Sequence, residues 1–125
     1  MTESALPRVL VVDDDSMILP LLRRWAVLAG YEPVAAADGP EAIEAWRRHA
    51  NIVAVVTDVR MSGMDGRKLV SILRNERPDL PVVFISGFTG SAEAPDLEYR
   101  PFAAFVAKPF RFKDLDDALT SVTAA

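Results

Sequence analysis

Asp13, Asp14, Asp58, Ser86 and Lys108 are the side chains of this sequence whose types, taken together, suit the handling of a phosphoryl group. Crowded carboxylates repel one another unless a divalent cation neutralises them, and carboxylates with a carbonyl and waters suit Mg²⁺, or Mn²⁺ in its place. An aspartate can attack a phosphoryl donor and form an acyl phosphate. A metal ion and a lysine ammonium group then balance the charge on the transferring group. The residue types predict a phosphoryl-accepting site, provided that the fold brings them together.

Each of these residues stands at the end of a short, mostly apolar segment. The segments cover residues 9–12, 53–57, 82–85 and 105–107. Continuous apolar segments of this length are typical of strands buried on both faces, as in parallel sheets. In such sheets ligands bind in the crevice at the carboxyl ends of the strands. We therefore expect the polar side chains to converge at one edge of a parallel sheet.

Helical segments alternate with the strands along the chain. Asp15 or Ser16 is expected to cap the first helix, Pro20 lies in its first turn, and Gly30 ends it. The residues expected to face the core from the four helices are Ile18, Leu21, Leu22, Trp25 and Leu28, then Ala42, Ile43 and Trp46, then Leu69, Val70, Ile72 and Leu73, and in the last helix (113–122) Leu115, Ala118, Leu119 and Val122. A further strand is expected over residues 32–36. The pattern predicts an α/β fold with a five-stranded parallel sheet covered on both faces.

The stretch between Ser86 and Phe102 departs from this alternation. It contains Gly87, Gly90, Pro95 and Pro101 and has no helical period. An alternating fold requires a crossover here, so we expect a short or irregular fourth helix.

Length and composition narrow the class of protein. The 125 residues, 50% hydrophobic and 26% charged, predict one globular domain, which we place at 8–123 after a leader at 1–7 and with no output domain. No segment has the roughly 20 apolar residues of a membrane span, and the start has no features of a signal peptide. The net charge of −4, with scattered basic residues, argues against nucleic-acid binding. The absence of cysteine fits a cytoplasmic protein.

Four motifs surround the polar residues, at Val11–Asp15, Thr57–Gly66, Ser86–Gly87 and Lys108–Phe110. In this order and spacing they resemble the receiver domain of response regulators from two-component signalling, of the stand-alone, single-domain type. The resemblance implies a flavodoxin-like, doubly wound five-stranded sheet. It also implies that the protein is a phosphorylation-dependent switch and not an enzyme, catalysing only its own phosphorylation and slow dephosphorylation.

The resemblance assigns a role to each site residue. Asp58 would be the phosphoacceptor, and Lys108 would pair with the phosphoryl oxygens. Asp13, Asp14, Asp58 and the backbone carbonyl of Arg60 would hold Mg²⁺.

The resemblance also assigns roles outside the metal site. Ser86 would bond to the phosphoryl group, and Phe105 would be the switch aromatic, although it could equally be a plain apolar residue of the fifth strand. Arg60 and Phe88 would tune the lifetime of the acyl phosphate. Ser62 stands where proline is commonest in the family.

The implied partners are a histidine kinase or histidine phosphotransfer protein as donor, and a target protein bound by the fourth-helix region, the fifth strand and the last helix. One alternative is a Mg²⁺-dependent phosphatase of the haloacid-dehalogenase type, which uses an Asp-x-Asp motif after its first strand. Met17 occupies the place where those enzymes have Thr or Val, and there is no substrate-capping insertion. A flavodoxin-like cofactor binder is a further alternative, but no phosphate-binding loop rich in Ser, Thr and Gly follows the first strand.

Overall fold

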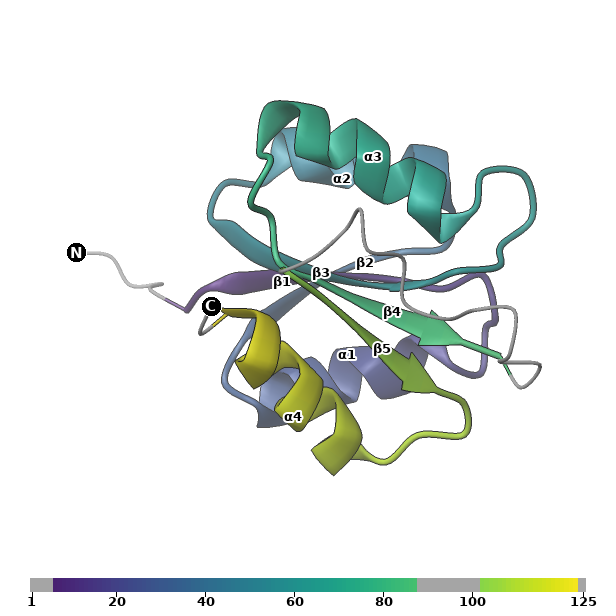
Figure 1. The fold of residues 1–125 in the computed structure, drawn as a ribbon, viewed down its shortest axis with the longest axis vertical. Coiled ribbons are helices and arrows are strands. Elements are labelled where there is room, and N and C mark those ends of the chain that lie inside the picture. The colour runs from purple at the N-terminus through teal and green to yellow at the C-terminus, as the bar shows by residue number, and fades with distance from the viewer. Residues whose placement is uncertain (1–5, 88–101, 124–125) are drawn as a thin grey trace.

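The computed structural model describes residues 6–87 and 102–123, and within them five parallel strands form a single sheet. The order across the sheet is β2-β1-β3-β4-β5 (Figure 1). The strands are β1 (Arg8–Val12), β2 (Glu32–Ala36), β3 (Ile52–Asp58), β4 (Val82–Ser86) and β5 (Ala103–Ala107). The predicted strands and their parallel arrangement are confirmed.

Helices cover both faces of this sheet (Figure 1). They are α1 (Leu19–Leu28), α2 (Gly39–Arg48), α3 (Gly66–Glu76) and α4 (Phe112–Thr123). Helices α2 and α3 lie on one face, and α1 and α4 lie on the other (Figure 1). This is the doubly wound α/β arrangement, in which the strand order reverses at β1 and opens a crevice between the ends of β1 and β3.

The alternation of side chains along each strand explains why successive positions of the strand segments are mostly apolar. Leu10 and Phe84 pack in the cluster under α2 and α3, whereas Val9 and Ile85 pack in the cluster under α1 and α4. All four are fully buried. Because each such side chain stabilises the fold by about 1.5–3 kcal/mol, burial on both faces is a large part of the driving force for folding.

Helices α2 and α3 each begin at an aspartate cap. Asp38 Oδ1 accepts the Glu41 N–H at 2.8 Å at the start of α2, and Asp65 Oδ1 accepts the Lys68 N–H at 3.0 Å at the start of α3. Each cap satisfies a backbone donor that has no partner within its helix.

The start of α1 does not follow the predicted capping. The helix begins at Leu19 after Ile18, and no side chain caps it. Asp15 instead closes a turn, because its Oδ1 accepts the Met17 N–H at 2.8 Å and its carbonyl accepts the Ile18 N–H at 3.0 Å. The prediction of an Asp15 or Ser16 cap was therefore wrong.

The buried face of α1 is narrower than predicted. Leu22 and Trp25 are buried, but Leu21 is 44% exposed and Leu28 is 66% exposed. The Trp25 indole N–H donates to Asp116 of α4 at 2.7 Å, which orients the inward face of α1 toward α4. Leu21 lies about 100° around the helix axis from Leu22, and that rotation turns it to solvent.

The expected short or irregular helix between β4 and β5 falls at residues 88–101, outside the described residues. Among the described helices, none has the length and apolar character needed to cross a membrane.

Candidate phosphoryl-acceptor site

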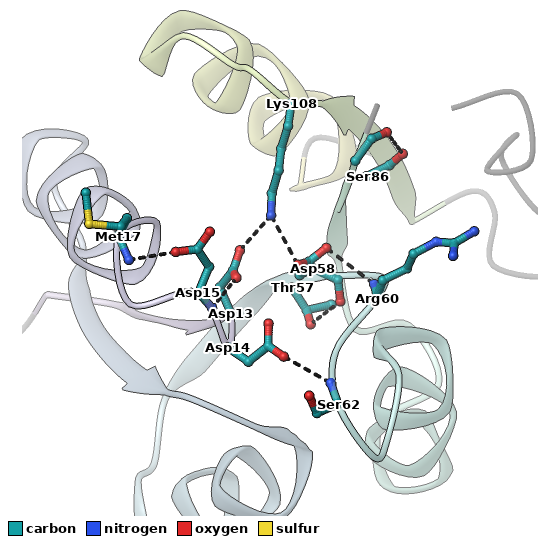
Figure 2. Close-up of polar contacts among 11 residues, drawn as sticks. Asp13, Asp14, Asp15, Met17, Thr57, Asp58, Arg60, Ser62, Ser86 and Lys108 are labelled. Atoms are coloured by element: carbon teal, nitrogen blue, oxygen red, sulfur yellow. Dashed lines mark hydrogen bonds and ion pairs between the residues drawn. The ribbon is translucent and has the colours of Figure 1, made fainter. Parts of the chain in front are cut away.

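The carboxyl ends of β1 and β3 bring the predicted aspartates together. Val12 pairs with Thr57 across the two strands, so Asp13 and Asp58 follow side by side. One carboxylate oxygen from each of Asp13, Asp14 and Asp58 lies within 4.8 Å of the other two, and Figure 2 shows the three side chains together. The predicted convergence of these three residues is confirmed as geometry.

Lys108 reaches the same cluster from the end of β5. Its backbone N–H donates to the Ser86 carbonyl at 2.8 Å, which continues the pairing of β4 with β5. Its Nζ lies 3.1 Å from Asp58 Oδ2 and 3.2 Å from Asp13 Oδ2 (Figure 2). The ammonium group therefore bridges two carboxylates that come from neighbouring strands.

Burial and charge act against each other in this cluster. Burial, with the nearby Asp58 charge, raises the pKa of Asp13 above its usual value, although the Asp15 N–H and Lys108 oppose the rise. Burial alone would lower the pKa of Lys108, but the Asp13 and Asp58 carboxylates together outweigh it and raise that pKa. Lys108 is thus held in its charged form. Its single positive charge balances only part of the negative charge of the carboxylates.

Backbone N–H groups orient all three carboxylates. The Asp15 N–H donates to Asp13 Oδ1 at 2.9 Å. The Arg60 N–H donates to Asp58 Oδ1 at 3.3 Å, and the Ser62 N–H donates to Asp14 Oδ2 at 3.0 Å (Figure 2).

These residues fit a divalent cation held by oxygen ligands. Asp13 Oδ2 is buried, has Lys108 as an ion-pair partner and accepts no hydrogen bond from the described residues. Two of the three carboxylates share the charge of one ammonium group, and hard oxygen donors of this kind suit Mg²⁺.

The other residues predicted for the site are Ser86, Phe105, Arg60 and Phe88. Ser86 is buried, and its hydroxyl donates to the Gly87 carbonyl at 3.2 Å. Phe105 is partly buried and stacks on Phe84, with 4.9 Å between ring centroids. The Arg60 side chain is exposed and points away from the carboxylates in Figure 2. Phe88 lies outside the described residues.

Two residues that the sequence analysis did not assign support the acceptor. Thr57 is fully buried, and its hydroxyl donates to the Asp58 carbonyl at 3.0 Å. Gly66 donates its N–H to the Val59 carbonyl at 2.8 Å, and a β-carbon at Gly66 would overlap the Asp58 carbonyl oxygen. In the sequence, Thr57 could have been noticed as a hydroxyl residue within an apolar strand segment, and Gly66 as a glycine directly after the Asp65 cap.

Comparison with known proteins agrees with this geometry. The family model of the response regulator receiver domain matches residues 9–120. The chain belongs to this family. The receiver domain is 32% identical over 110 residues to the response regulator protein FleR of Pseudomonas aeruginosa, a match that covers 88% of this chain and 23% of FleR.

Other relatives are regulators as well. The receiver domain is 42% identical over 80 residues to the transcriptional regulatory protein PrrA of Mycobacterium tuberculosis, covering 64% of this chain and 34% of PrrA. It is 30% identical over 116 residues to the probable transcriptional regulator ycf27 of Porphyridium aerugineum, covering 92% of this chain and 47% of that protein. The receiver domain therefore spans less than half the length of these relatives.

Solved structures of receiver proteins share the fold. A response regulator receiver protein from Sinorhizobium medicae matches with a TM-score of 0.84 and 29% identity, covering 96% of both chains. The response regulator TrrA of Thermotoga maritima, solved in complex with Mg²⁺ and BeF, matches with a TM-score of 0.80 and 27% identity, covering 94% of this chain and 99% of TrrA.

Proposed function

We propose that this receiver domain works as a phosphorylation switch that accepts a phosphoryl group on Asp58 from a histidine kinase or a histidine phosphotransfer protein. The observation that carries the proposal is the contact of the Lys108 ammonium group with Asp13 and Asp58. These two carboxylates form one cluster with that of Asp14. An acceptor carboxylate with a cation on either side is what phosphoryl transfer requires, because the reaction depends on positioning and on balancing charge.

The transfer breaks one bond and forms another at phosphorus. A carboxylate oxygen of Asp58 attacks, the P–N bond to the donor imidazole breaks, and the imidazole nitrogen keeps the electron pair. Asp13, Asp14, Asp58 and the Arg60 carbonyl would hold Mg²⁺, which supplies a Lewis acid for the phosphoryl oxygens. Lys108, held charged by its neighbours, exchanges its contact with Asp58 for a phosphoryl oxygen.

The signal passes to a target through Ser86 and Phe105. Ser86 exchanges its bond to the Gly87 carbonyl for one to the phosphoryl group. Phe105 borders a groove between β5 and α4, which Pro109, Asp114 and Ala118 also line. The Phe105 ring itself packs on Phe84, on the face of the sheet that α2 and α3 cover, so a change in the ring would alter the edge strand β5. We propose this edge strand, together with the groove, as part of the surface that the target reads.

The donor docks on α1. Among the described residues, four of the five exposed large apolar side chains lie on this helix or just before it, and the fifth is Leu6: Met17 is 76% exposed, Leu21 44%, Val27 61% and Leu28 66%. We propose that these side chains form an apolar patch of the kind that marks protein interaction sites. Met17 adjoins the acceptor site, since its N–H bonds to Asp15 (Figure 2).

Intact-mass spectrometry after incubation with acetyl phosphate and Mg²⁺ tests the acceptor. The wild-type chain should gain one phosphoryl group, and Asp58→Asn should gain none. Asp15→Asn is the matched control, because Asp15 is exposed and its carboxylate bonds only to the nearby Met17 N–H among the described residues. Equal labelling of Asp58→Asn would refute the assignment.

Turnover of p-nitrophenyl phosphate separates the switch from the haloacid-dehalogenase-type alternative. A receiver domain is modified once and then decays slowly, whereas a phosphatase releases product over many cycles. Sustained turnover that Asp58→Asn leaves intact would favour the phosphatase.

A further inference from the structure

Asp14 differs from the other two carboxylates of the cluster in its surroundings. Asp13 is 1% exposed and Asp58 is 6% exposed, so packing limits their movement, but Asp14 is exposed. Asp13 and Asp58 also contact Lys108, and no such ion pair is recorded for Asp14 within the described residues. The contact that orients Asp14 comes from the Ser62 backbone N–H, which donates to Oδ2 at 3.0 Å.

The loop that carries Ser62 is held in place on both sides. The Val59 N–H donates to the Ile85 carbonyl at 3.0 Å, and the Val59 carbonyl accepts the Gly66 N–H at 2.8 Å. Between these points Met61 is buried, with only 9% exposed. The anchored loop aims the Ser62 N–H at a carboxylate that lies 48 residues earlier in the chain.

The two oxygens of Asp14 have different surroundings. Oδ2 accepts the Ser62 N–H, and Figure 2 shows the other oxygen turned toward Asp13 and Asp58. A carboxylate has about four acceptor positions, so one N–H leaves ample capacity for a cation. The bond to Ser62 therefore orients Asp14 without blocking it.

We propose that the Ser62 backbone N–H is a positioning group for divalent-cation binding, acting through Asp14. It holds the exposed carboxylate in the orientation that faces the cluster, so the cation does not have to order that side chain when it binds. Hydrogen-bond donors to ligating carboxylates generally strengthen metal binding in this way. The inference rests on the proposed function, because it concerns the same cation site.

The Ser62 N–H could also have the opposite effect on cation affinity, and the two effects predict different results when the N–H is removed. If the N–H competed with the cation for Asp14, removing it would strengthen binding. If it positions Asp14, removing it weakens binding.

A proline at position 62 removes the backbone N–H, and an alanine keeps it. Isothermal titration calorimetry with MgCl₂, at constant ionic strength and without a phosphoryl donor, measures the affinity directly. We expect Ser62→Pro to bind Mg²⁺ about tenfold more weakly than the wild type, and Ser62→Ala to bind as the wild type does. Unchanged or tighter binding by Ser62→Pro, in a wild type that binds Mg²⁺, would overturn the proposal alone. No binding by the wild type would refute the proposed cation site as well.

A double-mutant cycle tests whether the effect passes through Asp14. In an Asp14→Ala background the substitution Ser62→Pro should cause no further loss of Mg²⁺ affinity, because the acceptor of the bond is gone. An equal loss in both backgrounds would show that proline acts through the loop and would overturn the proposal.

The Ser62 amide proton gives a readout that does not depend on the proline variant folding. In NMR spectra of the wild type, hydrogen exchange of this amide should stay slow, or become slower, as Mg²⁺ is added. Faster exchange in the Mg²⁺-bound form would mean that the bond breaks on binding, which contradicts a positioning role.

Discussion

The Lys108 ammonium group lies 3.1 Å from Asp58 Oδ2, although the strands at whose ends the two residues lie are not neighbours in the sheet. Asp58 ends β3 and Lys108 follows β5, and β4 lies between them in the sheet. The lysine side chain therefore crosses the end of β4, where Ser86 is located, to reach the acceptor. Through this long, charged side chain, Lys108 connects the acceptor Asp58 to β5, the strand that carries Phe105.

Replacing Lys108 by alanine should slow phosphorylation of Asp58 by acetyl phosphate about 100-fold or more, because a charge that balances the transferring group is lost. Without Mg²⁺ the melting temperature should also fall, and added Mg²⁺ should restore more of it than in the wild type. Lys113→Ala is the matched control, since Lys113 is exposed and pairs with Asp117 on the same helix. Labelling of Lys108→Ala at the wild-type rate would contradict the assigned role.

Replacing Gly66 by alanine should lower the free energy of unfolding by about 1–3 kcal/mol, because the new methyl group overlaps the Asp58 backbone. The methyl would also lie 3.2 Å from the Thr57 hydroxyl oxygen. Urea denaturation measures the stability, and acetyl phosphate labelling should slow in parallel. Gly87→Ala serves as the control, because a β-carbon there meets nothing within 4 Å. Equal stability of the two variants would show that the backbone near Asp58 yields easily.

Replacing Val27 and Leu28 by serine should reduce phosphoryl transfer from a protein donor about tenfold, since burying an apolar side chain of this size contributes about 1.5 kcal/mol or more. Labelling by acetyl phosphate, which needs no docking surface, should stay unchanged. Leu6→Ser is the matched control, because Leu6 is 56% exposed and lies outside α1. A similar fall with both donors would point to damage at the acceptor instead of a docking surface.

Binding of beryllofluoride with Mg²⁺ should change the environment of the Phe105 ring, which stacks on Phe84 with an interplanar angle of 29°. NMR of the aromatic protons measures the change. Ser86→Ala should still bind beryllofluoride but should show a smaller shift at Phe105, because the hydroxyl that responds to the acceptor is missing. An unchanged ring in the wild type would leave Phe105 as a packing residue of β5.

The sheet and the polar residues at its edge were predictable from the sequence alone. Strands buried on both faces are apolar at nearly every position, so β1, β3 and β4 were recognisable without tertiary information. In a parallel sheet the carboxyl ends share one edge, which placed Asp13, Asp58 and Lys108 together.

The buried face of α1 and the backbone groups that reach the site depend on how the folded elements pack, which the sequence pattern does not show. Leu21 and Leu28 fit a helical period but are exposed, because Leu22, Trp25 and Ala26 form the face of the helix that is buried against the sheet. The N–H of Ser62 reaches Asp14 because the loop after β3 is anchored at Val59. Every residue other than proline carries a backbone N–H, so only the path of the folded chain determines which of them points at a carboxylate.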